Sequence, residues 1–64
     1  MGDYGFIFDT KEQCDIFSDY VDEELLWSKR ENATTLTVRS IFESTASDLH
    51  TVANAIKEGT YNEN

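Results

Sequence analysis

Carboxylate side chains supply most of the chemistry that this sequence offers. Five acidic residues recur at three- and four-residue intervals in one short segment, namely Glu12, Asp15, Asp19, Asp22 and Glu23. At about 100° per residue, a helix over this segment gathers the five carboxylates in one sector. The same helix turns an apolar sector the other way, made of Cys14, Ile16, Phe17, Tyr20 and Val21. Such a row of carboxylates can bind a metal ion, take part in acid–base catalysis or meet a basic partner.

A metal site or a catalytic site needs neighbouring residues that this sequence lacks. The spacing and central glycine of a calcium loop are absent near Asp22, and one cysteine with one histidine cannot make a zinc site. Burial and negative neighbours both raise the pKa of a thiol, so Cys14 is interpreted as a core residue. His50 falls beside the apolar stripe of the last predicted helix and is interpreted as a surface residue. With no phosphate loop or catalytic motif, we expect no metal, no cofactor and no enzymatic activity.

The charge balance decides which partners are compatible with the chain. Thirteen acidic residues against five basic ones give a net charge of −8. A field of this sign repels nucleic acid and anionic membranes and attracts basic surfaces. The basic residues Lys29, Arg30 and Arg39 are interpreted as offsetting carboxylates across strands, and Lys11 is the only basic residue on the acidic face. No apolar run approaches the roughly 20 residues of a membrane span.

The first half of the chain predicts a strand followed by a helix. Residues 4–8 alternate aromatic and smaller side chains with period two, as in a strand. Thr10 and Gln13 then form a capping box for a helix that runs from Lys11 to about Glu23. Three acids at the end of that helix oppose its dipole.

The second half predicts a hairpin and a second helix. Residues 25–31 and 34–42 form two strands joined by a turn at Asn32, with Phe42 on the same face as the apolar residues of the second strand. Ser44 or Thr45 is expected to cap the helix, whose apolar stripe consists of Ala46, Leu49, Val52, Ala53 and Ile56. Gly59 ends the helix, and residues from about 60 to 64 are expected to form a frayed tail.

The order β-α-β-β-α predicts one α+β domain over residues 1–64. Two helices would cover one face of a three-stranded sheet, as in a ferredoxin-like fold without its last strand. The first and third strands are neighbours in that fold, which leaves the first strand as an edge. A chain of this size has a small core and no disulfide, so we expect a homodimer. Its interface is expected to involve aromatic residues, namely Tyr4, Phe6, Phe8 and Trp27, although the first strand can equally face the core.

This combination of small size, acidity and missing catalytic motifs resembles the small acidic proteins that bacteriophages make to inhibit host enzymes. That class includes anti-restriction, anti-CRISPR and other anti-defence proteins. The resemblance implies a short, non-catalytic and often dimeric protein, and several members of the class imitate DNA. Carboxylates at three- and four-residue intervals stand about 5–6 Å apart along a helix, a separation comparable to that of phosphates along a DNA strand.

Two functions follow from these observations. The first is a phage-encoded inhibitor in the host cytoplasm, a location that the unpaired cysteine fits. It would bind a host protein with a basic surface through the acidic residues Glu12, Asp15, Asp19, Asp22 and Glu23. The alternative is a small cellular interaction module, such as an antitoxin or an assembly factor, whose acidity serves only solubility. In that case the aromatic strand and Trp27 would carry the contact.

Overall fold

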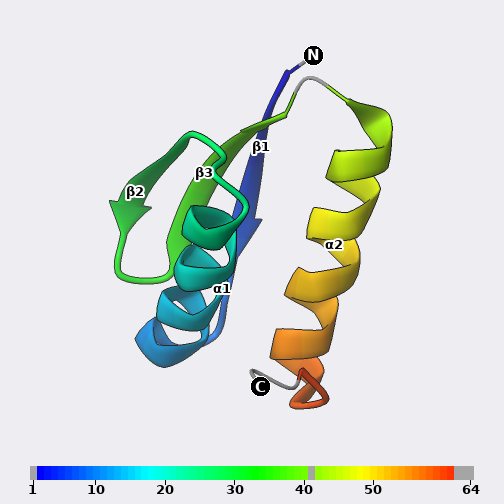
Figure 1. The fold of residues 1–64 in the computed structure, drawn as a ribbon. Helices are drawn as coiled ribbons and strands as arrows, with labels where there is room; N and C mark the ends of the chain where they lie inside the picture. The colour runs from blue at the N-terminus through cyan, green and yellow to red at the C-terminus, as the bar shows by residue number, and fades with distance from the viewer. Residues whose placement is uncertain (1, 41, 62–64) are drawn as a thin grey trace.

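The fold is an α+β arrangement of three strands and two helices, seen in a computed structural model that describes residues 2–40 and 42–61. In chain order the elements are β1 (Gly2–Ile7), α1 (Lys11–Glu23), β2 (Ser28–Asn32), β3 (Thr35–Ser40) and α2 (Glu43–Glu58). The sheet is antiparallel with the order β1-β3-β2 (Figure 1). The predicted element order, and the predicted pairing of the first strand with the third, are confirmed.

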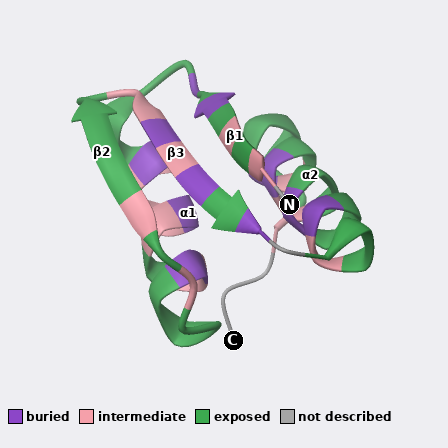
Figure 2. Ribbon diagram, turned by 90° about the horizontal axis from the view of Figure 1, so that it is seen from above, coloured by how far each residue is buried: buried purple, intermediate pink, exposed green. Residues whose placement is uncertain are grey.

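Both helices pack on one face of this sheet. Along β3 the side chains of Leu36 and Val38 are buried. Figure 2 shows buried positions alternating with more exposed ones along this strand. The core cluster takes residues from β1, the link that follows it, β3 and both helices, namely Phe6, Phe8, Cys14, Phe17, Val21, Leu36, Val38, Leu49, Ala53 and Ile56. The period-two and helical patterns of the sequence therefore converge on a single core.

The aromatic residues of the predicted first strand, residues 4–8, belong mainly to this core. Phe6 and Phe8 are each only 3% exposed, and their ring centroids lie 4.7 and 5.2 Å from that of Phe17. Their assignment to an oligomer interface is therefore wrong at the level of side chains, because helix α1 already covers them. Tyr4 is half-buried, with its ring 5.8 Å from His50, so only Tyr4 and Trp27 remain as interface predictions.

Helix α1 has the predicted bounds, and its first turn is capped as expected with one difference. The backbone N–H of Gln13 donates to Thr10 Oγ1 at 3.2 Å. The side chain of Gln13 accepts from the backbone N–H of Asp9 at 2.9 Å, one residue before the expected partner. Both bonds satisfy backbone donors at the start of the helix or just before it.

The end of α1 explains why β2 begins later than predicted. Leu25 has a φ of 58°, a left-handed conformation that is normally taken by glycine at this position. Its N–H donates to Asp22 O at 3.0 Å, and the N–H of Leu26 donates to Val21 O at 3.2 Å. This pair of bonds closes the helix with a Schellman motif, so Leu25 and Leu26 are part of the helix end and not of the strand.

The start of α2 also differs from the prediction. The N-cap is Phe42, which makes no side-chain cap bond, and the helix begins at Glu43 rather than after Ser44 or Thr45. Buried Ser40 is the reason, because its hydroxyl donates to Phe42 O at 2.9 Å and accepts from Phe42 N at 3.3 Å. This local ring turns the chain directly after β3, and it leaves Phe42 exposed instead of on the inner face of the sheet.

The predicted end of α2 is confirmed, whereas the predicted tail is only partly right. Gly59 closes the helix with a φ of 78°. Thr60 and Tyr61 are not frayed, because their N–H groups donate to Ala55 O at 2.9 and 3.2 Å. Residues 62–64 lie outside the described part of the chain.

Candidate functional site

The five carboxylates of the predicted acidic face all lie on α1, but the structure divides them into groups with different surroundings. Asp15 accepts a hydrogen bond from Lys11 Nζ at 2.8 Å and another from Arg30 Nη2 at 2.8 Å. These two bonds, the Lys11 bond more than the Arg30 bond, lower the pKa of Asp15 below its ordinary range. Asp15 is therefore neutralised within the chain itself.

The contact with Arg30 corrects the expectation that Lys11 is the only basic residue near this face. Arg30 lies on β2 and is held in place by two further bonds, from Nε to Asn32 O at 2.9 Å and from Nη2 to Ala33 O at 2.8 Å. The hairpin thus carries a guanidinium to the flank of α1. Sequence spacing gives no sign of this contact, because it depends on how the hairpin packs beside the helix.

The other two hairpin cations also meet carboxylates, but only Arg39 does so across strands as predicted, because Lys29 and Glu31 both lie on β2. Arg39 Nε donates to Asp3 Oδ1 across the β1–β3 pair at 3.0 Å. Lys29 Nζ lies 3.8 Å from Glu31 Oε1. With Arg30 on Asp15, all three cations have carboxylate partners.

The remaining carboxylates of α1 are without basic partners inside the described residues. No ion pair of residues 2–40 and 42–61 includes the exposed acids Glu12, Asp19, Asp22 or Glu23. Three of these acids stand in the second half of the helix, whose last turn contains no basic residue. Their mutual repulsion and the negative end of the helix dipole add together, so this part of the surface favours an external cation.

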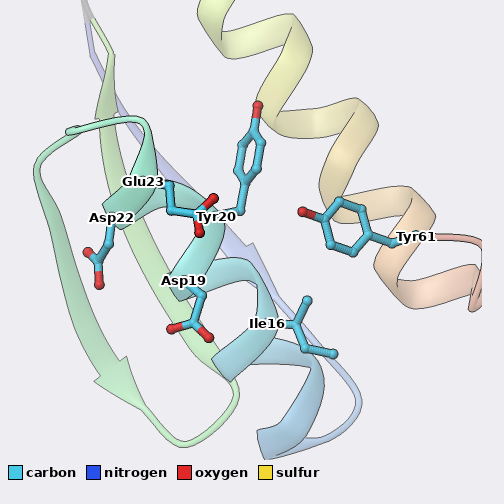
Figure 3. Close-up of a pocket in the computed structure, with 6 residues that line it drawn as sticks. All are labelled: Ile16, Asp19, Tyr20, Asp22, Glu23 and Tyr61. Carbon is cyan, nitrogen blue, oxygen red and sulfur yellow. The ribbon is translucent and has the colours of Figure 1, made fainter. Parts of the chain in front are cut away.

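These three acids line a cavity between α1 and the chain that follows α2. The cavity has a volume of about 280 Å³ and is lined by Ile16, Asp19, Tyr20, Asp22, Glu23 and Tyr61. Figure 3 shows five of these side chains on α1, with the ring of Tyr61 reaching toward them from the opposite side. Tyr61 is the one lining residue that the sequence did not suggest, because it was assigned to a frayed tail. Its backbone bond to Ala55 brings it back to the helix layer.

Tyr20 forms part of the wall with its hydroxyl protonated. Burial raises the pKa of Tyr20, and the negative charges of Glu24 and Asp48 raise it further. Its ring centroid is 6.5 Å from that of Tyr61, and the two ring planes are nearly perpendicular at 84°. The cavity therefore combines carboxylates with two tyrosine rings.

Cys14 and His50 take the structural positions expected of them. The Cys14 side chain is completely buried in the core, and desolvation raises the pKa of its thiol. His50 is exposed on α2, with its ring centroid 5.0 Å from that of Phe6. In the described part of the chain, no three side chains of His, Cys, Asp or Glu are grouped closely enough to hold a metal ion.

A second exposed surface lies on the opposite face of the sheet. Trp27 is 48% exposed, and the guanidinium of Arg39 lies 4.5 Å from the centroid of its ring. Leu25, which is 91% exposed, lies two residues before it. The Trp27 ring is therefore accessible, and its role as an anchor for a partner stays a prediction.

Neither described helix has the length and apolar content needed to cross a membrane. Comparison of the chain with protein-family models, with curated proteins and with solved structures gave no match. The geometry of the molecule is thus the basis from which its function is inferred.

Proposed function

We propose that this protein is a non-catalytic binding protein that holds a basic surface of a partner protein against the carboxylates of α1. One observation carries the proposal. Asp19, Asp22 and Glu23 are exposed, have no basic partner among the described residues and stand toward the unfavourable end of the helix dipole. A basic partner relieves that repulsion, and long-range attraction steers it to the site.

In its specific form, the proposal is a phage-encoded inhibitor that occupies the basic groove of a host defence or nucleic-acid-handling protein. The support is the chain's small size, its net charge of −8 and the row of carboxylates at helical intervals. In this form the protein binds stoichiometrically and blocks a groove that nucleic acid would otherwise fill. The charge balance disfavours direct contact with nucleic acid.

Reversing the charge at the end of α1 tests this function without threatening the fold. The double variant Asp22→Lys with Glu23→Lys places cations in the last turn and replaces the Asp19–Glu23 repulsion by attraction. We expect a free energy of unfolding higher by about 0.5–2 kcal/mol, together with loss of binding. Loss of binding by a more stable protein cannot be attributed to misfolding.

The assay is capture of basic proteins from bacterial lysate on immobilised wild type and on the variant, over a range of salt concentrations. A partner that wild type retains at low salt, and that is lost on the variant and as salt rises, supports the function. The matched control is Glu43→Lys with Glu58→Lys, which makes the same charge change on exposed residues of α2. Retention that is equal on wild type and on the α1 variant contradicts the proposal.

The exposure of Trp27 supports a second candidate, a cellular interaction module that binds through this ring and Leu25. The close approach of Arg39 keeps the indole ordered, so little side-chain entropy is lost when a partner covers it. For this candidate, Trp27→Ala removes retention of the partner, whereas reversal of the α1 charges leaves it intact.

A further inference from the structure

A second, smaller cavity adjoins the cavity beside α1. The smaller cavity has a volume of about 100 Å³ and is lined by Ile16, Ile56, Gly59 and Tyr61. Ile16 and Tyr61 line both cavities, so these two side chains form a wall that the cavities share. We call the combined depression the α1–Tyr61 groove. One end of it is acidic and aromatic, and the other end is apolar.

The acidic end has the chemistry of a site for an organic cation. Carboxylates alone suit many cations, but here two tyrosine rings stand among them, and ring faces attract cations that are weakly hydrated. A bare metal ion is disfavoured, because no metal-holding group of three such ligands exists among the described residues. A guanidinium fits best, since it is planar, stacks on aromatic rings and donates to carboxylates in pairs.

The size of the groove suits a side chain. At about 280 Å³ the acidic cavity stands at the lower end of the roughly 300–1,000 Å³ of typical small-molecule pockets. The apolar cavity beside it, walled by Ile16 and Ile56, suits a short aliphatic group. A segment of protein that carries a basic residue next to an aliphatic one supplies both groups.

We propose that the α1–Tyr61 groove binds an arginine side chain of a partner protein, with a neighbouring aliphatic residue of that partner in the smaller cavity. The guanidinium lies beside the rings of Tyr20 and Tyr61, which already meet edge to face, and it donates to Asp19 and Glu23, which stand one helical turn apart. This inference rests on the proposed function and deepens it, because it names the residue type by which the basic partner is recognised.

A dipeptide titration tests the groove without knowledge of the partner. The probe is acetyl-arginyl-leucine amide, added to the ¹⁵N-labelled protein while amide shifts are recorded. We expect saturable shifts centred on Ile16, Asp19, Tyr20 and Tyr61, with a dissociation constant in the millimolar range for so small a ligand. The citrulline analogue has nearly the same shape without the charge, and we expect it to bind at least tenfold more weakly.

Two variants and a matched control locate the effect. Asp19→Asn with Glu23→Gln, and separately Tyr61→Ala, are each expected to weaken arginine binding at least fivefold. The control Glu12→Gln with Glu43→Gln removes the same charge from exposed helix positions outside the groove, and we expect it to change binding less than twofold.

Several results would overturn the proposal. One is that the citrulline peptide, or a lysine peptide, binds as tightly as the arginine peptide. Another is that the control variant loses as much binding as the groove variants. A third is that the amide shifts never saturate as the peptide is added. These results are independent of the lysate experiment above, which measures retention of a basic protein by all the charges of α1 together. If the lysate partner is retained in a salt-sensitive way but the dipeptide titration fails, the proposed function is supported and arginine binding in the groove is ruled out. Absence of charge-dependent retention overturns the proposed function itself.

Discussion

Arg30 of β2 and Asp15 of α1 are joined by a hydrogen bond of 2.8 Å between the guanidinium and the carboxylate, which ties the outer strand of the hairpin to the first helix. The same carboxylate also accepts from Lys11. Of the five acids predicted on this face, Asp15 thus serves the fold rather than a partner. Reversal of its charge would be a poor test of function, because it would place a third cation beside Arg30 and Lys11.

The pairing of Asp15 makes stability depend on pH in a definite direction. The pKa of Asp15 is lower in the folded chain than in the unfolded one. Its contribution is therefore fully present above the unfolded pKa, and it is lost as the pH falls through the folded pKa. We expect Asp15→Asn to lower the free energy of unfolding at neutral pH, and we expect the difference from wild type to shrink in strong acid.

Urea unfolding at a series of pH values measures this effect. Glu12→Gln is the control, since Glu12 is an exposed acid of the same helix without a basic partner among the described residues. It should lower stability less than Asp15→Asn does, because Glu12 loses only its interaction with the start of the helix dipole and no ion pair. A difference between Asp15→Asn and wild type that stays constant down to acid pH would contradict the argument.

Leu25 is predicted to be replaceable by glycine with a gain in stability. Its φ of 58° forces the β-carbon against the backbone, a strain that glycine does not have. After subtraction of the extra freedom of glycine in the unfolded chain, Leu25→Gly should raise the free energy of unfolding by about 0.5–1 kcal/mol. Leu25→Ala keeps the β-carbon and removes only the exposed part of the side chain, so denaturant unfolding should find it close to wild type. A stabilisation shared by both variants would mean that exposure of the leucine, and not backbone strain, is the cause.

The thiol of Cys14 is predicted to be unreactive while the protein is folded. It is completely buried, and desolvation raises its pKa, so both access and the thiolate form are suppressed. Labelling with a chromogenic disulfide reagent at neutral pH should proceed only at the rate of unfolding, and it should become complete at once in denaturant. Rapid labelling of the native protein would show that helix α1 opens locally.

The free edge of β1 is the predicted contact of the homodimer that the chain's size suggests. Phe8 N donates to Thr34 O of the neighbouring chain segment, so by the alternation of a ladder the N–H groups of Gly5 and Ile7 point away from β3. Pairing of two β1 edges would give a continuous six-stranded sheet. Size-exclusion chromatography with light scattering at micromolar concentration should report a dimer.

Ile7→Lys places a charge on the exposed side of that edge, and it should shift the equilibrium toward the monomer. The control is Thr51→Lys, which adds the same positive charge at an exposed position of α2. A monomeric wild type would rule out the dimer, and dissociation by both variants would rule out the β1 edge as its contact.

The parts of the fold that could be predicted from sequence are those with local causes. Helix α1 was predicted with the right bounds because Thr10 and Gln13 cap it within three residues of sequence. Gly59 likewise marks the end of α2 by its own backbone freedom. The start of α2 was missed because the Ser40 hydroxyl, not a capping side chain, turns the chain there.

The candidate site was only half predictable for the same reason. The carboxylates of α1 follow from helical periodicity, but their division into a paired Asp15 and a groove-lining set depends on contacts between distant segments. Arg30 comes from 15 positions along the chain. Tyr61 reaches α1 from beyond α2, and its only local signal was an aromatic residue shortly after a helix-ending glycine. Such a residue is better placed against the helix layer than in a tail.

Of the three strands, β1 is synthesised before the others, and its partner β3 is synthesised after them. Asp3 finds Arg39 36 positions later, whereas the β2–β3 hairpin closes locally. At 5–20 residues per second, translation leaves β1 waiting roughly 2–7 s for its only neighbour in the described sheet. Phe6 is without its partner Leu36 during that interval. The entropy of closing this long loop must be lost before the β1–β3 contacts form, so this pairing is the slow step in forming the sheet.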